Sequence, residues 1–413
     1  MTDRLYYHDS FLYEFEGEIT EVVPAAEINA RHGVYLDRTA FYPTSGGQVH
    51  DTGWISSSDK SSDKDKLRVA EVVEEEDGRV VHYIEADKAP ERGTRIRGVI
   101  DPARRRDHMQ QHSGQHVLSA AFLRLFEMPT VSFHMGDEVC TIDLETKSAT
   151  AGQIDAAEDL ANQVVMEDRP VEIRFVSLEE ARGLGLRKLP PVEREQLRLI
   201  DIRDFDLTAC GGTHVGSTGQ IGPILVRKAE KVRQGVRVEF VCGGRGLAAA
   251  RRDRLALNEA AGVLSAHIWE MPQQVRKLAE EGKAARKLRS DLLNELAELH
   301  AGRLLQETPE TNGFHLVART FPDRDLEFIK LLAQKLVRTE GKRAVALLGA
   351  GEGSPALVFA QTAGLAFDMG ALMKEALAAI GGRGGGTKDM AQGGVVRAEM
   401  LETALQKIRG KLA

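Results

Sequence analysis

The chain has few cysteines, no long apolar run and no excess of positive charge. Its three cysteines, Cys140, Cys210 and Cys242, are a small odd number in 413 residues, which argues against a disulfide framework. No uninterrupted apolar stretch approaches the ~20 residues that a membrane-spanning helix needs. The first residues, MTDRLYYHDSFLYEFEGE, include acidic side chains where a signal peptide would be apolar. These absences predict a soluble, cytoplasmic protein with no membrane partner.

The balance of charges limits the kinds of partner. Lys and Arg total 55 against 62 Asp and Glu, so the formal net charge is −7 and the whole molecule does not attract polyanions. Any contact with nucleic acid must therefore come from local basic patches. With 42% hydrophobic residues the composition is that of a globular protein, and its length exceeds what one core of roughly 150 residues accommodates.

Patterns along the chain predict an α+β multidomain protein. Residues 1–100 contain short β-like runs separated by turns and predict a small β-barrel-like domain. Residues 101–245 mix helical and strand patterns and predict an α+β domain. Residues 246–310 are helical in character and predict a linker that forms a helical hairpin, a short coiled coil or a helix packed on its own chain. Residues 311–413 return to an α/β pattern.

Three histidines in DHMQQHSGQH (107–116) give the strongest chemical signal. His108, His112 and His116 are spaced by four on a predicted helix, so neighbouring pairs share a face and can converge on one metal ion. The later segment CGGTH (210–214) adds a thiol and an imidazole, with two glycines that allow a tight turn. Three nitrogens and one sulfur suit tetrahedral zinc. The alternatives for Cys210 are a nucleophile paired with its neighbouring histidine, or an inert buried thiol.

Four separated motifs carry a resemblance to a known family. They are FYPTSGGQVHDTG (41–53), HSGQHVLSA (112–120), CGGTHV (210–215) and GGRGGGTKDMAQGG (381–394). Together they resemble the editing and C-terminal domains of alanyl-tRNA synthetases, and in particular the long form of the free-standing AlaX alanyl-tRNA editing proteins. The resemblance extends over nearly the whole chain. It implies a zinc-binding editing domain in 101–245 and a glycine-rich domain of the DHH-associated type in 311–413.

The resemblance also implies an activity. Family members hydrolyse tRNA(Ala) that is mischarged with serine or glycine. The chain starts at the editing region, so we expect an aminoacyl-tRNA deacylase that acts in trans and does not charge tRNA. The family pattern begins at His112, so the implied ligands of one zinc ion per chain are His112, His116, Cys210 and His214, with His108 outside the set. Four protein ligands are typical of a structural zinc, whereas a catalytic zinc usually keeps one position open. Two roles for the zinc therefore stay open: it activates water, or it only orients the substrate.

The segment SGGQ (45–48) and two other segments are expected to form the rest of the site. Adjacent Gly46 and Gly47 allow close approach to a substrate, and Gln48 can both donate and accept hydrogen bonds; the alternative is a simple tight turn. A pocket that selects serine needs a polar partner for its hydroxyl. Candidate catalytic residues are Gln48 and Thr213, and candidate substrate-binding residues are Gly46, Gly47, Ser132 and His134, the last with a surface position as its alternative.

Local basic clusters are the expected tRNA contacts, although such runs also occur as solvated surfaces. One cluster precedes the predicted metal helix, one lies in RKAEKVRQGVR (227–237), and one lies in the glycine-rich segment, which suits approach to phosphate but lacks a Walker-type ending. The family also implies a homodimer through the C-terminal region. The six predicted tRNA-binding residues are Arg104, Arg105, Arg233, Arg237, Arg383 and Lys388.

Two other functions compete with deacylation. One is a tRNA-binding module whose zinc is structural and which has no catalysis. The other is a phosphoesterase, because the C-terminal domain type accompanies DHH phosphoesterases. That function requires an Asp-His-His metal centre, whereas the only Asp-His step here, Asp107–His108, is followed by Met109.

Overall fold

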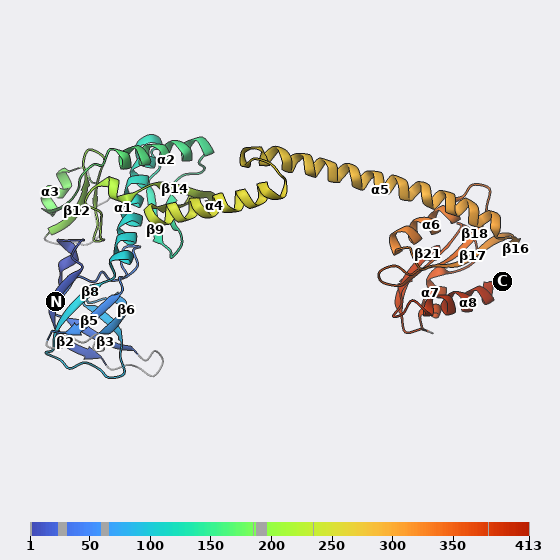
Figure 1. The fold of residues 1–413 in the computed structure, drawn as a ribbon, viewed down its shortest axis with the longest axis horizontal. Helices are drawn as coiled ribbons and strands as arrows, with labels where there is room; N and C mark the ends of the chain where they lie inside the picture. The colour runs from blue at the N-terminus through green and yellow to red at the C-terminus, as the bar shows by residue number, and fades with distance from the viewer. Residues whose placement is uncertain are drawn as a thin grey trace. The chain divides into compact units, whose positions relative to one another are not determined.

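The computed structural model divides into two compact units, Met1–Glu259 and Ala260–Ala413 (Figure 1). The predicted boundaries at residues 100, 245 and 310 divide the chain more finely and remain predictions. In the described part of the chain, no helix is both long and apolar enough to cross a membrane. The residues described are 2–23, 31–58, 66–184, 186, 196–233, 235–378 and 380–412.

A closed six-stranded barrel forms the N-terminal part of the first unit, which confirms the barrel-like prediction (Figure 1). Alternating residues such as Ile19, Val34, Val69 and Ile84 fill its interior. The short strand β5 was not predicted. In barrel order the strands are β2 (Glu14–Val23), β3 (Arg31–Leu36), β7 (Val80–Glu85), β6 (Leu67–Glu74), β5 (Gly53–Ser57) and β8 (Arg95–Ile100).

Helix α1 (Pro102–Phe126) leaves the barrel and forms the core of the next part. It begins where the Asp101 carboxylate accepts hydrogen bonds from the first turn, and it ends at Glu127 in a left-handed conformation. Gly114 lets it approach a neighbouring strand, because a Cβ there would lie 2.2 Å from the sulfur of Cys242. Its partners are α2 (Ala151–Met166) and the sheet β14 (Ile224–Val232), β15 (Gly235–Cys242), β10 (Cys140–Leu144) and β9 (Thr130–Met135).

A second, three-stranded antiparallel sheet completes the first unit. It consists of β11 (Val171–Ser177), β12 (Gln196–Ile202) and β13 (Asp206–Ala209). The short helix α3 (Leu178–Gly183) covers Val176, Leu197 and Leu199. The CGGTH segment follows β13 directly, so this sheet determines where Cys210 begins its turn.

Two helices occupy most of the predicted linker: α4 (Gly243–Val263) and α5 (Met271–Glu307). The helical character is confirmed. The end of α5 is buried within the second unit through Ala297, Ala301 and Leu304, which join the core of α6 (Leu326–Arg338). Whether the helices act as a hairpin or a coiled coil stays a prediction.

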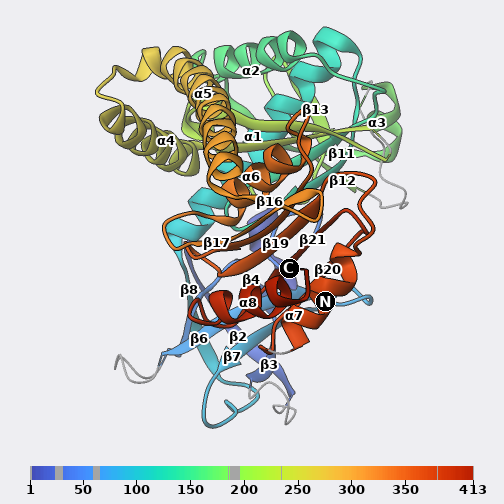
Figure 2. The same cartoon turned by 90° about the vertical axis from the view of Figure 1, so that its right-hand side faces the viewer.

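The second unit is a six-stranded mixed sheet covered by helices on both faces (Figure 2). Helices α5 and α6 pack on one face, and α7 (Met369–Ala378) and α8 (Met400–Leu412) on the other. Only β17 and β18 run parallel. In sheet order the strands are β16 (Glu310–Thr311), β17 (Phe314–Phe321), β18 (Ala344–Ala350), β19 (Ala356–Gln361), β21 (Met390–Gly394) and β20 (Arg383–Gly386).

The glycine-rich segment 381–394 forms a β-hairpin, and its suggested role in approaching phosphate stays a prediction. Strands β20 and β21 pair antiparallel at the sheet edge. A Cβ on Gly384 would lie 2.3 Å from the Cα of Gly393, and a Cβ on Gly393 would lie 2.3 Å from Leu377. The glycines therefore serve close packing of the hairpin beneath α7. Arg383 and Lys388 are exposed on this hairpin.

Arg105 is a structural residue, which corrects its prediction as a tRNA contact. Its side chain is fully buried and forms a two-pronged ion pair with Asp51. The same guanidinium donates to the carbonyl oxygens of Ser10 at 2.8 Å and Ala40 at 2.5 Å. A sequence cluster of three arginines does not show which member points inward. On this helix the exposed member is Arg106.

We expect Arg105→Ala to destabilise the first unit strongly, because it leaves the buried Asp51 carboxylate without its cation. Breaking such a pair costs roughly 3–5 kcal/mol, or about 10 °C in Tm. The matched control Arg106→Ala should stay within about 0.5 kcal/mol of the parent. Thermal unfolding followed by circular dichroism measures both. Equal melting temperatures for the two variants would contradict the buried role.

Candidate metal centre

Four side chains from two distant segments meet at one buried point. His112 and His116 lie one turn apart on α1, and Cys210 and His214 lie in the turn after β13; their ligand atoms are all within 4.8 Å of one another. The Cys210 sulfur is 3.4 Å from Nε2 of His112 and 3.4 Å from Nε2 of His214. Zinc bonds of ~2.3 Å to sulfur and ~2.0 Å to nitrogen separate tetrahedral ligands by about 3.5 Å. The cluster therefore has the dimensions needed to hold a metal ion.

The side chain of Gln48 determines the orientation of His112. The Thr213 backbone N–H can only donate, and it lies 3.2 Å from the oxygen of the Gln48 amide. That oxygen is also 2.6 Å from Nδ1 of His112, which must therefore carry the proton. Nε2 of His112 then presents its lone pair to the cluster. The Gln48 nitrogen donates to the Thr213 hydroxyl at 2.9 Å, so both polar atoms of the amide are occupied.

The other two histidines also have partners on Nδ1. His116 lies 3.4 Å from the Asp206 carboxylate, and His214 lies 3.1 Å from the Ser113 hydroxyl. Partners of this kind fix the ring and its tautomer in metal sites. The sequence analysis missed Asp206 and Ser113, because nothing in a single sequence distinguishes an outer partner from any other polar residue.

Burial and neighbouring charges favour the metal-binding protonation states of Cys210 and His214, whereas His116 must release a proton to bind a metal. Burial by itself raises the pKa of the Cys210 thiol, but His112 and His214 outweigh it and lower that pKa well below its usual value. Burial, with help from His112, lowers the pKa of His214 to about 3, so this imidazole is neutral. Burial also acts to lower the pKa of His116, yet the hydrogen bond to Asp206 prevails and raises it to about 8. A thiolate and neutral imidazoles are the ligand forms.

The SGGQ turn lies against strand β9, beside the cluster. Gly46 and Gly47 have φ values of +58° and +85°, and the Gly47 carbonyl accepts from Met135 N–H at 3.1 Å. A Cβ on Gly47 would lie 2.6 Å from the carbonyl oxygen of Phe133, so glycine is required for this close approach. Hydrogen bonds between the backbones of Ser45 and Gln48 close the turn, and Gly46 and Gly47 are exposed on it.

Strand β9 directs Phe133, rather than its predicted neighbours, toward the cluster. The Phe133 ring stacks on His112 with centroids 5.5 Å apart. Ser132 and His134 point to the other, exposed face of the strand, where the Ser132 hydroxyl donates to Asp143 at 2.9 Å. Successive side chains along a strand point to opposite faces, so a prediction that is wrong by one residue selects the wrong face. The geometry therefore speaks against Ser132 and His134 as pocket residues.

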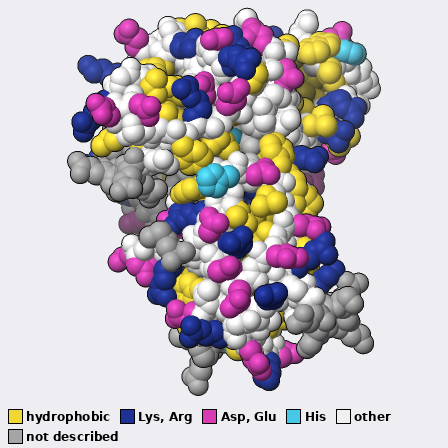
Figure 3. Space-filling view, turned by 90° about the vertical axis from the view of Figure 1, so that its left-hand side faces the viewer, with side chains coloured by type: hydrophobic (Ala, Val, Ile, Leu, Met, Phe, Trp, Pro, Cys, Tyr) yellow, Lys and Arg dark blue, Asp and Glu magenta, His cyan; other side chains and the backbone are white. Residues whose placement is uncertain are grey.

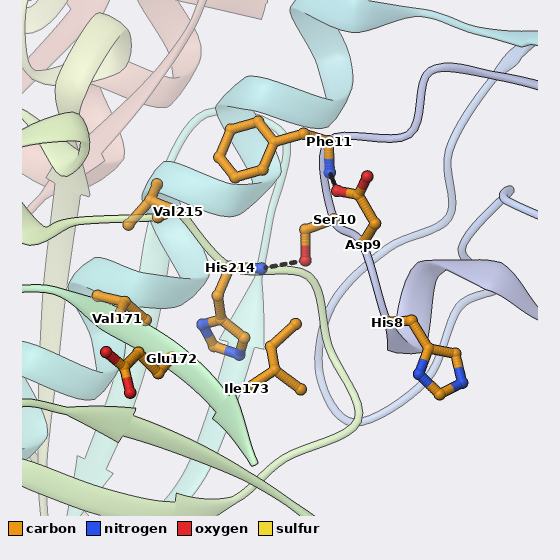
Figure 4. Close-up of a pocket in the computed structure, with 10 residues that line it drawn as sticks. His8, Asp9, Ser10, Phe11, Val171, Glu172, Ile173, His214 and Val215 are labelled. Carbon is orange, nitrogen blue, oxygen red and sulfur yellow. Dashed lines mark hydrogen bonds between the residues drawn. The ribbon is translucent and has the colours of Figure 1, made fainter. Parts of the chain in front are cut away.

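Two cavities reach the cluster. One, of about 430 Å³, is lined by His214 and the segment His8–Phe11, and Figure 4 shows the His214 side chain among Ser10, Ile173 and Glu172. The other, of about 420 Å³, is lined by Cys210, Gly211 and Ser45 of the SGGQ turn. Both volumes are within the range of small-molecule sites.

The remaining predicted tRNA contacts differ in how available they are. Arg104 is half-buried and donates to the carbonyl of His50 at 2.9 Å. Arg237 is exposed, but it forms two hydrogen bonds to Asp143. Arg233 is exposed near Lys147 and Lys231 in a shallow cavity. The face in Figure 3 shows basic and acidic side chains interspersed.

Comparison with known proteins decides the family. The chain is 30% identical to the alanyl-tRNA editing protein AlaX-L of Pyrococcus horikoshii over 420 residues, covering 100% of both chains. The chain belongs to this family of alanyl-tRNA editing proteins. It is also 33% identical to the alanine–tRNA ligase of Archaeoglobus fulgidus and 31% identical to that of Pyrococcus furiosus, covering 97% and 100% of this chain. It spans only 43% and 44% of the length of those two ligases.

Three family models match successive parts of the chain. Residues 2–104 match the class II (A) tRNA synthetases, and residues 197–238 match the second additional domain of threonyl- and alanyl-tRNA synthetases. Residues 315–413 match the DHHA1 domain. The second match includes Cys210 and His214, so two of the four cluster residues lie in a segment shared with these synthetases.

Two neighbouring glycines provide a sharp test of the cluster. A Cβ at Gly212 would lie 2.1 Å from the His112 ring, whereas a Cβ at Gly211 would find only Tyr7, at an ordinary 3.5 Å. We expect Gly212→Ala to displace His112 and weaken metal binding by at least tenfold, the effect of disturbing an outer partner. Gly211→Ala should bind metal as the parent does. Competition with a fluorescent chelator measures both affinities, and equal values would contradict the geometry.

Proposed function

We propose that this protein is an aminoacyl-tRNA deacylase that hydrolyses the ester of tRNA(Ala) mischarged with serine or glycine. The observation that carries the proposal is the cluster of His112, His116, Cys210 and His214, with each imidazole oriented by a partner and with cavities beside it. Its relative from Pyrococcus horikoshii is named an alanyl-tRNA editing protein, which supports the substrate class.

We propose zinc as the metal, one ion per chain, held by these four residues. Three imidazoles and a thiolate are a donor set that suits zinc in tetrahedral geometry. When bound, zinc supplies Lewis acidity that polarises a carbonyl or lowers the pKa of water. Cys210 is the half-buried member of the set and lines a cavity, so the substrate approaches the cluster most directly from its side.

The chain's own residues position the cluster and meet the ester. Gln48 and Thr213 are fully buried and bonded to each other, so they act as positioning residues that hold His112 and the CGGTH turn, rather than touching substrate. Gly46 and Gly47 are exposed residues on the turn that reaches the cavity through Ser45, and their backbone N–H groups are the proposed donors. They are suited to hydrogen-bond the oxygen of the ester carbonyl as charge develops there.

Contacts to the body of the tRNA come from exposed basic side chains. Arg233, Arg237, Arg383 and Lys388 are exposed, and Arg104 is half-buried beside the barrel. Backbone contacts of this kind carry no sequence information and weaken with salt. A homodimer formed through the C-terminal region and a cytoplasmic location remain predictions.

One observation favours a second candidate function. Four protein ligands, three of them buried, are typical of a structural zinc, as in a tRNA-binding module without catalysis. A phosphoesterase receives less support. Elsewhere in the described part of the chain, no group of three or more histidine, cysteine or acidic side chains lies close enough to share an ion.

Cys210→Ala tests the proposal directly. We expect the variant to lose zinc and to lose at least 100-fold in the rate of Ser-tRNA(Ala) hydrolysis, because a metal supplies several kcal/mol of transition-state stabilisation. Deacylation of Ser-, Gly- and Ala-tRNA(Ala) is measured alongside zinc content, and Ala-tRNA(Ala) should be spared by the parent.

Cys140→Ala is the matched control, because Cys140 is a buried free thiol that is not one of the four cluster residues. It should keep its zinc and its activity. An inactive parent protein whose zinc removal causes unfolding would establish the structural alternative. Full activity in metal-free Cys210→Ala would refute the zinc-dependent mechanism.

A further inference from the structure

The cavity on the Cys210 side contains an arginine whose charge is only partly matched. Arg198 on β12 is 8% exposed and lines this cavity. Its Nε donates to the carbonyl of Tyr7 at 2.8 Å and its Nη1 to the carbonyl of Cys210 at 2.6 Å. Its Nη2 has no hydrogen-bond partner among the described residues. A buried donor of a cationic group without a partner is costly unless a ligand supplies an acceptor.

The carboxylate of Glu74 in the same cavity does not pair with Arg198. Glu74 lines the cavity, but it pairs with Arg4 at 2.6 Å, and Arg4 also donates to the carbonyl of Gly78 at 2.8 Å. Among the charged groups around it, the sulfur of Cys210 attracts the Arg198 guanidinium most strongly, and a metal ion would engage that sulfur. Arg198 therefore gives the described lining of this cavity a positive charge that is hydrogen-bonded to carbonyl groups and to no carboxylate, which favours an anionic ligand.

An aromatic side chain stands directly opposite this arginine. Phe175 on β11 is the cross-strand partner of Arg198, so the two side chains leave the sheet on the same face. The Phe175 ring is 40% exposed, lines the same cavity and has the His8 ring 5.0 Å away. An exposed ring next to an arginine is the combination that proteins use to stack a base and hold its phosphate.

The cavity on the His214 side lacks this combination. Its described lining contains the carboxylates of Asp9 and Glu172 and no lysine or arginine, as Figure 4 shows. Phe11, which is 42% exposed, is its aromatic residue. A phosphate would meet negative charge there, so electrostatics favours the Cys210 side.

We propose that the cavity on the Cys210 side binds the terminal nucleotide of the acylated RNA, with its base stacked on Phe175 and its phosphate held by Arg198. This inference rests on the deacylase proposal and adds where the nucleotide lies. With its base and phosphate held there, the ribose is directed toward Cys210 and Gly211, which line the same cavity. The acyl ester on that ribose then faces the metal cluster. The cavity's volume of about 420 Å³ is of the size that small-molecule ligands occupy.

Binding of AMP and of adenosine to the zinc-loaded full chain tests this without requiring catalysis. We expect AMP to bind several-fold more tightly than adenosine, because only AMP offers a phosphate to Arg198. Phe175→Ala should weaken both by about tenfold, the loss that corresponds to one base stack. Phe11→Ala, the matched aromatic in the other cavity, should change neither. Titration calorimetry or NMR line shifts measure these affinities.

Arg198→Gln should remove the preference for AMP while leaving adenosine binding within about twofold. Arg174→Ala is the charge control, because Arg174 adjoins Phe175 in sequence but is exposed and pairs with Asp201. If Arg198→Gln fails to fold, the AMP preference of the parent and the comparison of Phe175 with Phe11 still decide.

Equal affinities for AMP and adenosine in the parent would overturn the proposal, as would a loss confined to Phe11→Ala. The expected binding pattern in a protein that does not hydrolyse Ser-tRNA(Ala) would overturn the deacylase function and leave the nucleotide site standing. If the protein hydrolyses Ser-tRNA(Ala) and Phe175→Ala leaves the KM of that reaction unchanged, the deacylase function stands and the nucleotide site is overturned. The two proposals therefore fail separately.

Discussion

The carboxamide of Gln48 is the contact on which the rest of the candidate metal centre depends. It bonds to His112 on α1 and to both the backbone and the hydroxyl of Thr213, so one side chain from the barrel connects the two ligand-bearing segments. Burial makes this arrangement demanding, since each of its polar atoms needs a partner once water is excluded. The SGGQ turn, with its two left-handed glycines, positions that amide between His112 and Thr213.

Two buried arginines hold the N-terminal segment 7–10 in place through hydrogen bonds to its backbone. Arg105 holds the carbonyl of Ser10, and Arg198 holds the carbonyl of Tyr7. The Ser10 hydroxyl in turn accepts from the backbone N–H of His214. The segment therefore lines both cavities. Its position is determined by hydrogen bonds from two buried guanidinium groups to its carbonyl oxygens.

Periodic features of the fold could be predicted from the sequence, and features that depend on distant partners could not. Strands such as Val171–Ser177 and Phe314–Phe321 follow from local alternation, and the four cluster residues follow from their spacing and the family motifs. The direction of an individual side chain is different. Arg105 and Arg106 are adjacent and chemically identical, and only the position of Asp51 makes one of them structural. Likewise, the register of β9 decides that Phe133 faces the cluster.

The separation of the cluster residues along the chain has a consequence for biosynthesis. Gln48, the helix with His112 and the turn with His214 are separated by more than 160 residues between the first and the last. On the ribosome, the barrel and α1 emerge long before the turn that supplies the thiolate. The N-terminal segment therefore lacks the hydrogen bond from the His214 N–H to Ser10 until about half of the chain has been made. The four residues of the candidate metal centre can therefore come together only after the turn at 210–214 has joined the barrel and α1.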